Sequence, residues 1–278
     1  MTTTFFTALG ENPFLLLALA AGLAASFASG VIGSFVVVKR IVSISGSIAH
    51  SVLGGMGVCL WLRRTYGLTE LTPLHGALAA GLLSALLMGW IHMRYKERED
   101  TVIAAIWATG MSIGVIFIAL TPGYNVELLN FLFGNILWVS HSDIKLLLSL
   151  DVLIAGTVAI FYRRFIAVCF DEEQALLQKA PVHALYLLLL CLVAIAVVLL
   201  IQVVGAILVI TMLAIPAAIA GTVTQTLARM MLIAILLGAL FTLLGMYFSY
   251  ELNWPPGATI SLVAALFYSI SLLRKRLK

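Results

Sequence analysis

Long, nearly uncharged apolar runs recur along this 278-residue chain and constrain its fold more than any other feature. A membrane-spanning helix needs about 20 apolar residues, because each residue rises about 1.5 Å and the hydrocarbon core is roughly 30 Å thick. Hydrophobic residues make up 63% of the chain and charged residues 10%, with a mean hydropathy of +1.14. Soluble globular domains do not have this composition. The sequence therefore predicts an all-α, polytopic transmembrane helical bundle.

The apolar runs predict eight or nine membrane spans. With nine, they lie at residues 14–38, 44–62, 73–93, 101–121, 143–162, 184–204, 206–223, 230–250 and 256–273. The number falls to eight if residues 184–223 are partly re-entrant. No segment has the composition of a separate soluble domain, so residues 1–278 are expected to form a single transmembrane permease domain.

Basic residues predict the orientation of the bundle, because Lys and Arg in short loops stay on the cytoplasmic side. With nine spans, all but three of the 16 basic residues fall on one face, the exceptions being Arg63, Arg64 and Lys145. This asymmetry predicts an external N-terminus and a cytoplasmic C-terminus. The cytoplasmic loops and the tail explain the net charge of +4, so nucleic acid is not an expected partner. No basic n-region precedes the first run, so no cleavable signal peptide is expected.

Two features within the apolar runs predict interrupted helices. Pro216, in MLAIPAAIAG, removes a backbone hydrogen bond and predicts a kink or break, and Gly134, in FLFGN, predicts a bend. Backbone opened at membrane depth must be buried by protein or line a watered cavity, and discontinuous helices often form transport sites. The alternative for Pro216 is a kink that only improves packing. The small residues of GSIAHSVLGGMG, at 46–57, predict close helix approach.

The longest polar stretch, RRFIAVCFDEEQALLQKAPVHA, begins at Arg163 on the predicted cytoplasmic face. Asp171, Glu172 and Glu173 precede ALLQ, as acidic residues do at a helix N-terminus, where they complement the helix dipole. The pattern predicts a short interfacial helix on which a partner pushes. The alternative is an ordinary solvated loop.

A lone histidine, His50, lies within the second apolar run, in SISGSIAHSVLGG. Imidazole binds metals and carries protons, and it is costly at membrane depth, so a role in a transport pathway is expected. The alternative is a buried histidine hydrogen-bonded to a neighbouring helix. Near the predicted external face, Glu127, His141 and Asp143 are possible entrance residues, or else interfacial polar groups. Asp151 is the other main ionisable residue within the spans.

Six sequence blocks, in order, carry a family resemblance. They are ASGVIGSFVVVKRIVSISGSIAHSVLGGMGVCL at residues 28–60, DTVIAAIWATGMSIGVIFIAL from Asp100, ELLNFLFGNIL from Glu127, CFDEEQALL from Cys169, VGAILVITMLAIPAAIA from Val204 and PPGATISLVAALFYSIS from Pro255. Together they resemble the ABC-importer permeases for zinc, manganese and iron(II), over nearly the entire chain.

The resemblance implies partners and a location. It implies two cytoplasmic ATPase subunits, an extracytoplasmic metal-binding protein and a second permease copy, as a homodimer or pseudo-dimer, in a prokaryotic plasma (inner) membrane. It also implies that the segment at about 163–183, with Asp171, Glu172 and Glu173, couples ATP-driven closure to the pathway. No permanently bound cofactor is expected, because the metal is the transported substrate.

The chain departs from the family pattern at two acidic positions. The family's first block usually carries D-x-x-x-H, whose side chains lie one helical turn apart on the same face. His50 stands at the histidine position, but Gly46 stands at the aspartate position, and Asn135 replaces an acid usual in the family. Ser47 adds at most a weak oxygen ligand. Imidazole without a carboxylate tilts the expected substrate towards zinc, with manganese or iron(II) as alternatives.

Other functional classes fit the sequence less well. A proton-coupled secondary transporter is an open alternative, although such proteins usually carry several ionisable residues within their spans. The chain lacks GxxxxGK[ST] and HExxH, and acidic residues within the spans are few, so an enzyme is not expected. ATP hydrolysis is expected in a separate partner subunit.

Overall fold

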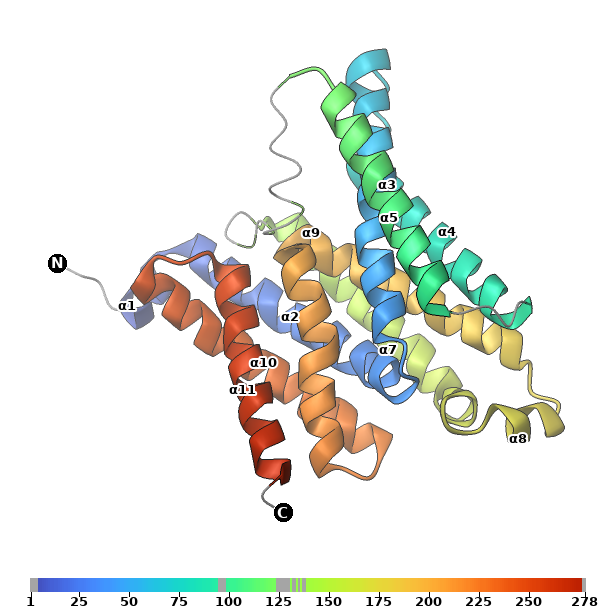
Figure 1. Cartoon of the computed structure of the whole chain (residues 1–278). Helices are drawn as coiled ribbons and strands as arrows, with labels where there is room; N and C mark the ends of the chain where they lie inside the picture. Colours follow the sequence, from blue (N-terminus) through green and yellow to red (C-terminus); the bar gives the residue numbers. More distant parts are fainter. Residues whose placement is uncertain are drawn as a thin grey trace. The chain divides into compact units, whose positions relative to one another are not determined.

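Helices account for the regular structure of the chain in a computed structural model that describes residues 5–94, 99–123, 131, 134, 136 and 139–276. No strand occurs among these residues. The helices are α1 (Phe5–Glu11), α2 (Pro13–Val38), α3 (Val42–Tyr66), α4 (Pro73–Arg94), α5 (Glu99–Leu120), α7 (His141–Phe170), α8 (Glu172–Leu177), α9 (Val182–Val223), α10 (Leu227–Leu252) and α11 (Pro256–Arg276) (Figure 1). The all-α class is confirmed.

Within the described ranges, nine helical segments are long and apolar enough to cross a membrane. Helix α9 supplies two of them, Val182–Ile201 and Val204–Val223, and each is long enough to span by itself, which favours nine spans over eight. The fifth span was predicted to end at residue 162, but α7 continues to Phe170. Arg163 and Arg164 do not end the helix, because Phe165 and Val168 are fully buried and continue its apolar face.

Two compact units make up the chain, each built from segments that are far apart in sequence. One comprises Met1–Val37, Leu132–Thr157 and Val203–Lys278, and the other comprises Val38–Phe131 and Val158–Gln202. We call them unit 1 and unit 2. Because their segments alternate along the chain, no single cut separates the two units.

In unit 2, α3 packs against both α4 and α5, and the three helices run side by side in Figure 1. Glycines make this approach possible. A Cβ added at Gly54 would lie 2.8 Å from the carbonyl oxygen of Gly110 in α5, and one at Gly55 would collide with the carbonyl oxygen of Gly76 in α4. The close packing predicted from the small residues of α3 is therefore confirmed.

Unit 1 is held together by similar close contacts. Gly33 of α2 leaves no room for a Cβ against the carbonyl group of Leu213, and Gly245 of α10 abuts the backbone of Ile260 in α11. A buried hydrogen bond of 3.3 Å joins the hydroxyl groups of Ser26 and Thr242. Such contacts replace the hydrophobic driving force that is weak between helices in lipid.

The interruption in α9 lies at Gly205, not at Pro216. Gly205 has φ 80° and ψ 160°, a conformation open essentially only to glycine, whereas the backbone remains helical through Pro216. The sequence predicted a kink or a break at Pro216, and the helix does not break there, because proline removes one hydrogen bond without ending the helix. The predicted bend at Gly134 is confirmed, with φ 74°, and this glycine packs directly on the backbone of Val204 and Gly205. Protein thus covers the opened backbone, as membrane depth requires.

Candidate functional site

His50 lies in the first half of α3, one helical turn after the buried Gly46. Its ring stacks on the indole of Trp107 in α5, with 4.4 Å between ring centroids and an angle of 3° between ring planes. The Nδ1 atom is buried and has no hydrogen-bond partner among the described residues. A neutral imidazole has one nitrogen lone pair free to accept a hydrogen bond or bind an ion. His50 therefore offers an unused ring nitrogen within a membrane span.

Trp107, the ring on which His50 stacks, makes a further contact along α5. The indole Nε1 of Trp107 donates a hydrogen bond of 3.0 Å to the sulfur of Met111, one turn further along α5. Ser47 is fully buried, and its hydroxyl donates to the carbonyl oxygen of Ile103 at 2.9 Å. Ser47 therefore links α3 to α5 through this hydrogen bond. No group of three or more His, Cys, Asp or Glu side chains that could hold a metal occurs in the described part of the chain.

The predicted entrance residues are only partly described. Asp143 accepts hydrogen bonds from the backbone N–H of Ser140 at 3.0 Å and from its hydroxyl at 2.7 Å. The Ser140 hydroxyl in turn accepts from the backbone N–H of Asp143 at 3.3 Å, so the pair forms a capping box at the start of α7. His141 is exposed. Glu127 and Asn135 lie outside the described residues. This geometry gives Asp143 a structural role that sequence reasoning did not predict.

The predicted cytoplasmic helix exists as α8. Asp171 is its N-cap, since its side chain accepts a hydrogen bond of 2.9 Å from the backbone N–H of Gln174. Ala175 is buried, whereas the side chain of Leu177 is 84% exposed. Glu173 is also exposed. Helix α8 therefore presents an acidic and an apolar side chain away from unit 2.

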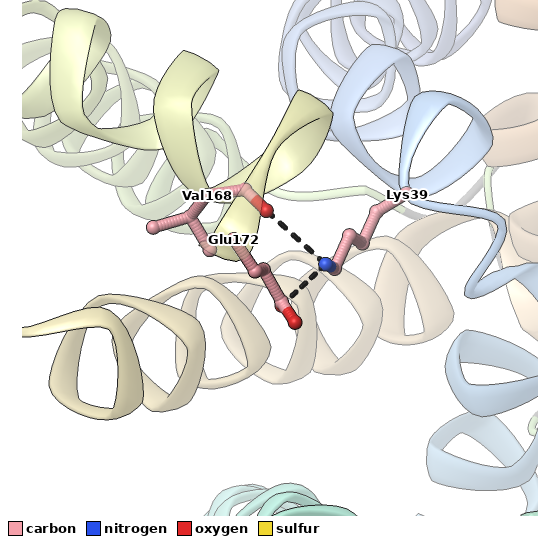
Figure 2. Close-up of polar contacts among 3 residues, drawn as sticks. All are labelled: Lys39, Val168 and Glu172. Atoms are coloured by element: carbon pink, nitrogen blue, oxygen red, sulfur yellow. Dashed lines mark hydrogen bonds and ion pairs between the residues drawn. The ribbon is translucent and has the colours of Figure 1, made fainter. Parts of the chain in front are cut away.

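Glu172 differs from its acidic neighbours because it pairs with Lys39, in the link between α2 and α3 (Figure 2). The Lys39 ammonium also donates a hydrogen bond of 3.1 Å to the carbonyl oxygen of Val168 in the last turn of α7. Lys39 was predicted only as one of the cytoplasmic basic residues. No local signal in the sequence marks it as the partner of an acid 133 residues away.

These observations define a multi-pass integral membrane protein whose apolar helices include one interrupted at a glycine and one with a histidine inside the span. The chain belongs to the ABC 3 transport family, whose model matches residues 11–275. It is a membrane permease of that family, as the resemblance in the sequence predicted.

Individual relatives and a solved structure agree with this assignment. The chain is 46% identical to a probable metal transport system membrane protein of Chlamydia trachomatis serovar D over 95% of this chain and 90% of that protein. It is 32% identical to the manganese transport system membrane protein MntC of Listeria innocua serovar 6a over 97% of this chain and 93% of the relative. The structure of PsaBC from Streptococcus pneumoniae in complex with Fab matches with a TM-score of 0.84 at 30% identity, covering 96% and 94% of the two chains.

Proposed function

We propose that this chain is the membrane-spanning subunit of an ATP-driven importer of divalent transition metal, with zinc as the favoured substrate. The observation that carries the proposal is His50, an imidazole with an unused nitrogen inside a span of an ABC 3 family permease. The importer would include a cytoplasmic ATPase subunit, an extracytoplasmic metal-binding protein and a second permease copy. It would lie in a prokaryotic plasma membrane with its C-terminus in the cytoplasm.

The choice of metal rests on the donors around His50. Imidazole suits zinc better than manganese, which prefers carboxylate and carbonyl oxygens. Gly46 supplies no carboxylate one turn before His50, and Ser47 is already hydrogen-bonded to Ile103. Manganese is the second candidate, because MntC relatives of this chain carry manganese in their names. Iron(II) remains the third metal to test.

In the proposed mechanism, the His50 imidazole is a transient ligand for a metal ion crossing the bilayer. A single neutral imidazole holds a divalent ion more weakly than a carboxylate–imidazole pair does, and a transport site must release its ion. The chain carries no phosphate-binding loop, so energy must come from a separate ATPase. Helix α8 is the proposed contact for that subunit, because its outer side chains are not buried against unit 2.

Purification of the tagged chain from membranes tests this function. We expect an ATPase subunit to co-purify, and its hydrolysis of ATP to rise when zinc and the metal-binding protein are added to proteoliposomes. If manganese or iron(II) stimulated ATP hydrolysis and zinc did not, that metal would be the substrate in place of zinc. Metal movement by the isolated chain without nucleotide would support a proton-coupled secondary transporter and overturn the ABC importer.

Gly46→Asp is expected to shift the metal preference towards manganese. The new carboxylate would stand one turn before His50, on the same helix face, and would supply the hard oxygen ligand that manganese favours. We expect the ratio of manganese to zinc uptake in proteoliposomes to rise about tenfold. Gly46→Asn is the control, because it has nearly the same shape without the charge. An equal shift in both variants would mean that size, and not the carboxylate, changes the selectivity.

Leu177→Asp is expected to weaken association with the ATPase subunit about tenfold. Its side chain is 84% exposed on α8, so a charge there should not disturb the packing of unit 2. Burial of an exposed apolar side chain against a partner contributes favourable free energy to binding, and an aspartate at this position removes that contribution. Co-purification and the dissociation constant of the ATPase measure the effect. Leu68→Asp is the control, an exposed leucine in the predicted external loop after α3. Equal binding by both variants would move the docking surface away from α8.

A further inference from the structure

The side chain of Lys39 joins three elements of unit 2 at the predicted cytoplasmic end of the bundle. Lys39 lies in the link between α2 and α3, pairs with Glu172 at the start of α8, and donates to the Val168 carbonyl group at the end of α7 (Figure 2). Its ammonium also lies 5.7 Å from the centre of the Tyr186 ring in α9. Figure 2 shows the side chain of Lys39 reaching from this link to both Val168 and Glu172.

The positive charge of Lys39 stabilises its two partners, Val168 and Glu172, for different reasons. The last carbonyl groups of a helix have no partner within it and lie at the negative end of its dipole, which is where Val168 lies in α7. Glu172 carries a full charge, and the side chain of Lys39 is only 15% exposed, against 38% for Glu172. A part-buried ion pair with a further hydrogen bond is screened less by solvent than a surface pair is. The Lys39 contacts therefore hold the α7–α8 corner to the start of α3.

The packing of α3 gives a route by which movement at Lys39 would reach His50. Helix α3 begins at Val42, three residues after Lys39, and His50 lies about 12 Å further along it at 1.5 Å per residue. The glycine contacts described above leave no gap between α3 and its neighbours α4 and α5, and Ser47 adds a hydrogen bond to α5. Closely packed helices move as a body, because their interfaces do not deform continuously.

We propose that Lys39 is the positioning residue through which displacement of α8 by the ATPase reaches α3 and His50. The inference rests on the proposed function. It adds that the three acidic residues at the start of α8 have different roles. Asp171 caps α8, Glu173 faces away from unit 2, and Glu172 transmits through Lys39. The Lys39–Glu172 pair thus connects α8 to the rest of the permease, whereas Leu177 belongs to the proposed contact with the ATPase.

Lys39→Met tests this role in the reconstituted complex. We expect the variant to bind the ATPase subunit as the wild type does, but to move at least fivefold less metal per ATP hydrolysed, a typical size for coupling between sites. Arg40→Met is the matched control, because it removes a positive charge from the same link, where Arg40 is exposed and has no ion pair with a described residue. It should transport normally.

Glu172→Gln and the double variant complete a thermodynamic cycle. If Lys39 and Glu172 act through one another, the double variant should be no worse than Lys39→Met alone. Glu173→Gln is the control for loss of an acid from α8. Hydrogen exchange gives a readout independent of metal, since amides of residues 172–180 should exchange faster in Lys39→Met than in Arg40→Met.

The outcomes separate this inference from the proposed function. Unchanged transport per ATP in Lys39→Met, additive effects in the cycle, or unchanged exchange would each overturn the role of Lys39. ATPase binding that falls as much as transport would make Lys39 a docking residue instead. Failure of any metal to stimulate the wild-type complex would overturn the proposed function itself.

Discussion

Replacement of His50 by alanine is expected to lower metal uptake at least tenfold in the reconstituted complex, with ATPase binding unchanged. The buried Nδ1 atom is the donor that the proposed pathway uses, and described residues offer no group of acids, cysteines and histidines that could take its place. Loss of an outer-shell partner of a metal ligand already costs about 10–100-fold in metal affinity, so loss of the ligand itself is expected to cost at least as much. Uptake of radioactive zinc into proteoliposomes at fixed ATP measures the effect.

A second substitution separates metal binding from packing at the same position. His50→Phe keeps an aromatic ring for the Trp107 stack but has no nitrogen, so it should fold like the wild type and transport as poorly as His50→Ala. His75→Ala is the control for loss of a histidine, since His75 is exposed at the start of α4 and contacts Thr72. Wild-type uptake by His50→Phe would exclude His50 as a ligand on the pathway.

Gly134→Ala is expected to destabilise the protein by about 2 to 5 kcal/mol. About 1–2 kcal/mol comes from placing a Cβ at φ 74°, and about 1–3 kcal/mol comes from overpacking. The added Cβ would lie less than 3.0 Å from the backbone of Val204 and Gly205, and backbone atoms cannot rotate away as side chains do. In detergent, the midpoint of thermal unfolding should fall by roughly 5–15 °C.

Gly156→Ala is the matched control for that experiment. Gly156 lies within α7, and a Cβ added there would meet nothing within 4 Å. Alanine is favoured over glycine in a helix by up to about 1 kcal/mol, so this variant should be as stable as the wild type or slightly more stable. Equal destabilisation by both substitutions would mean that the contact of Gly134 with the break in α9 contributes little.

The interruption of α9 shows why some features could not be read from residue types. Pro216 is conspicuous in a sequence because its ring always removes a hydrogen-bond donor. Gly205 is one of 22 glycines, and nothing in its neighbours shows that its φ must be positive. Gly134, 71 positions earlier, packs directly on the same site. The hydropathy pattern places the boundary between two spans at Gly205, but only the packed structure shows the positive φ of this residue.

The acidic segment before α8 illustrates the same limit at the candidate site. A short helix with Asp171 at its start could be predicted, because capping depends on residues a few positions apart. The difference between Glu172 and Glu173 could not be predicted, because both are acids in the same short run of sequence. The way α8 packs in the folded protein turns Glu172 towards Lys39 and leaves Glu173 exposed.

The sequence by itself determined the helical class, the positions of the spans and the presence of a histidine inside one of them. These features follow from the free energy of moving each run of residues from water into hydrocarbon, which depends on that run alone. The tertiary structure decided that His50 stacks on Trp107 and that Lys39 meets Glu172. Such contacts depend on how helices distant in sequence pack against each other, and local hydropathy carries no information about that packing.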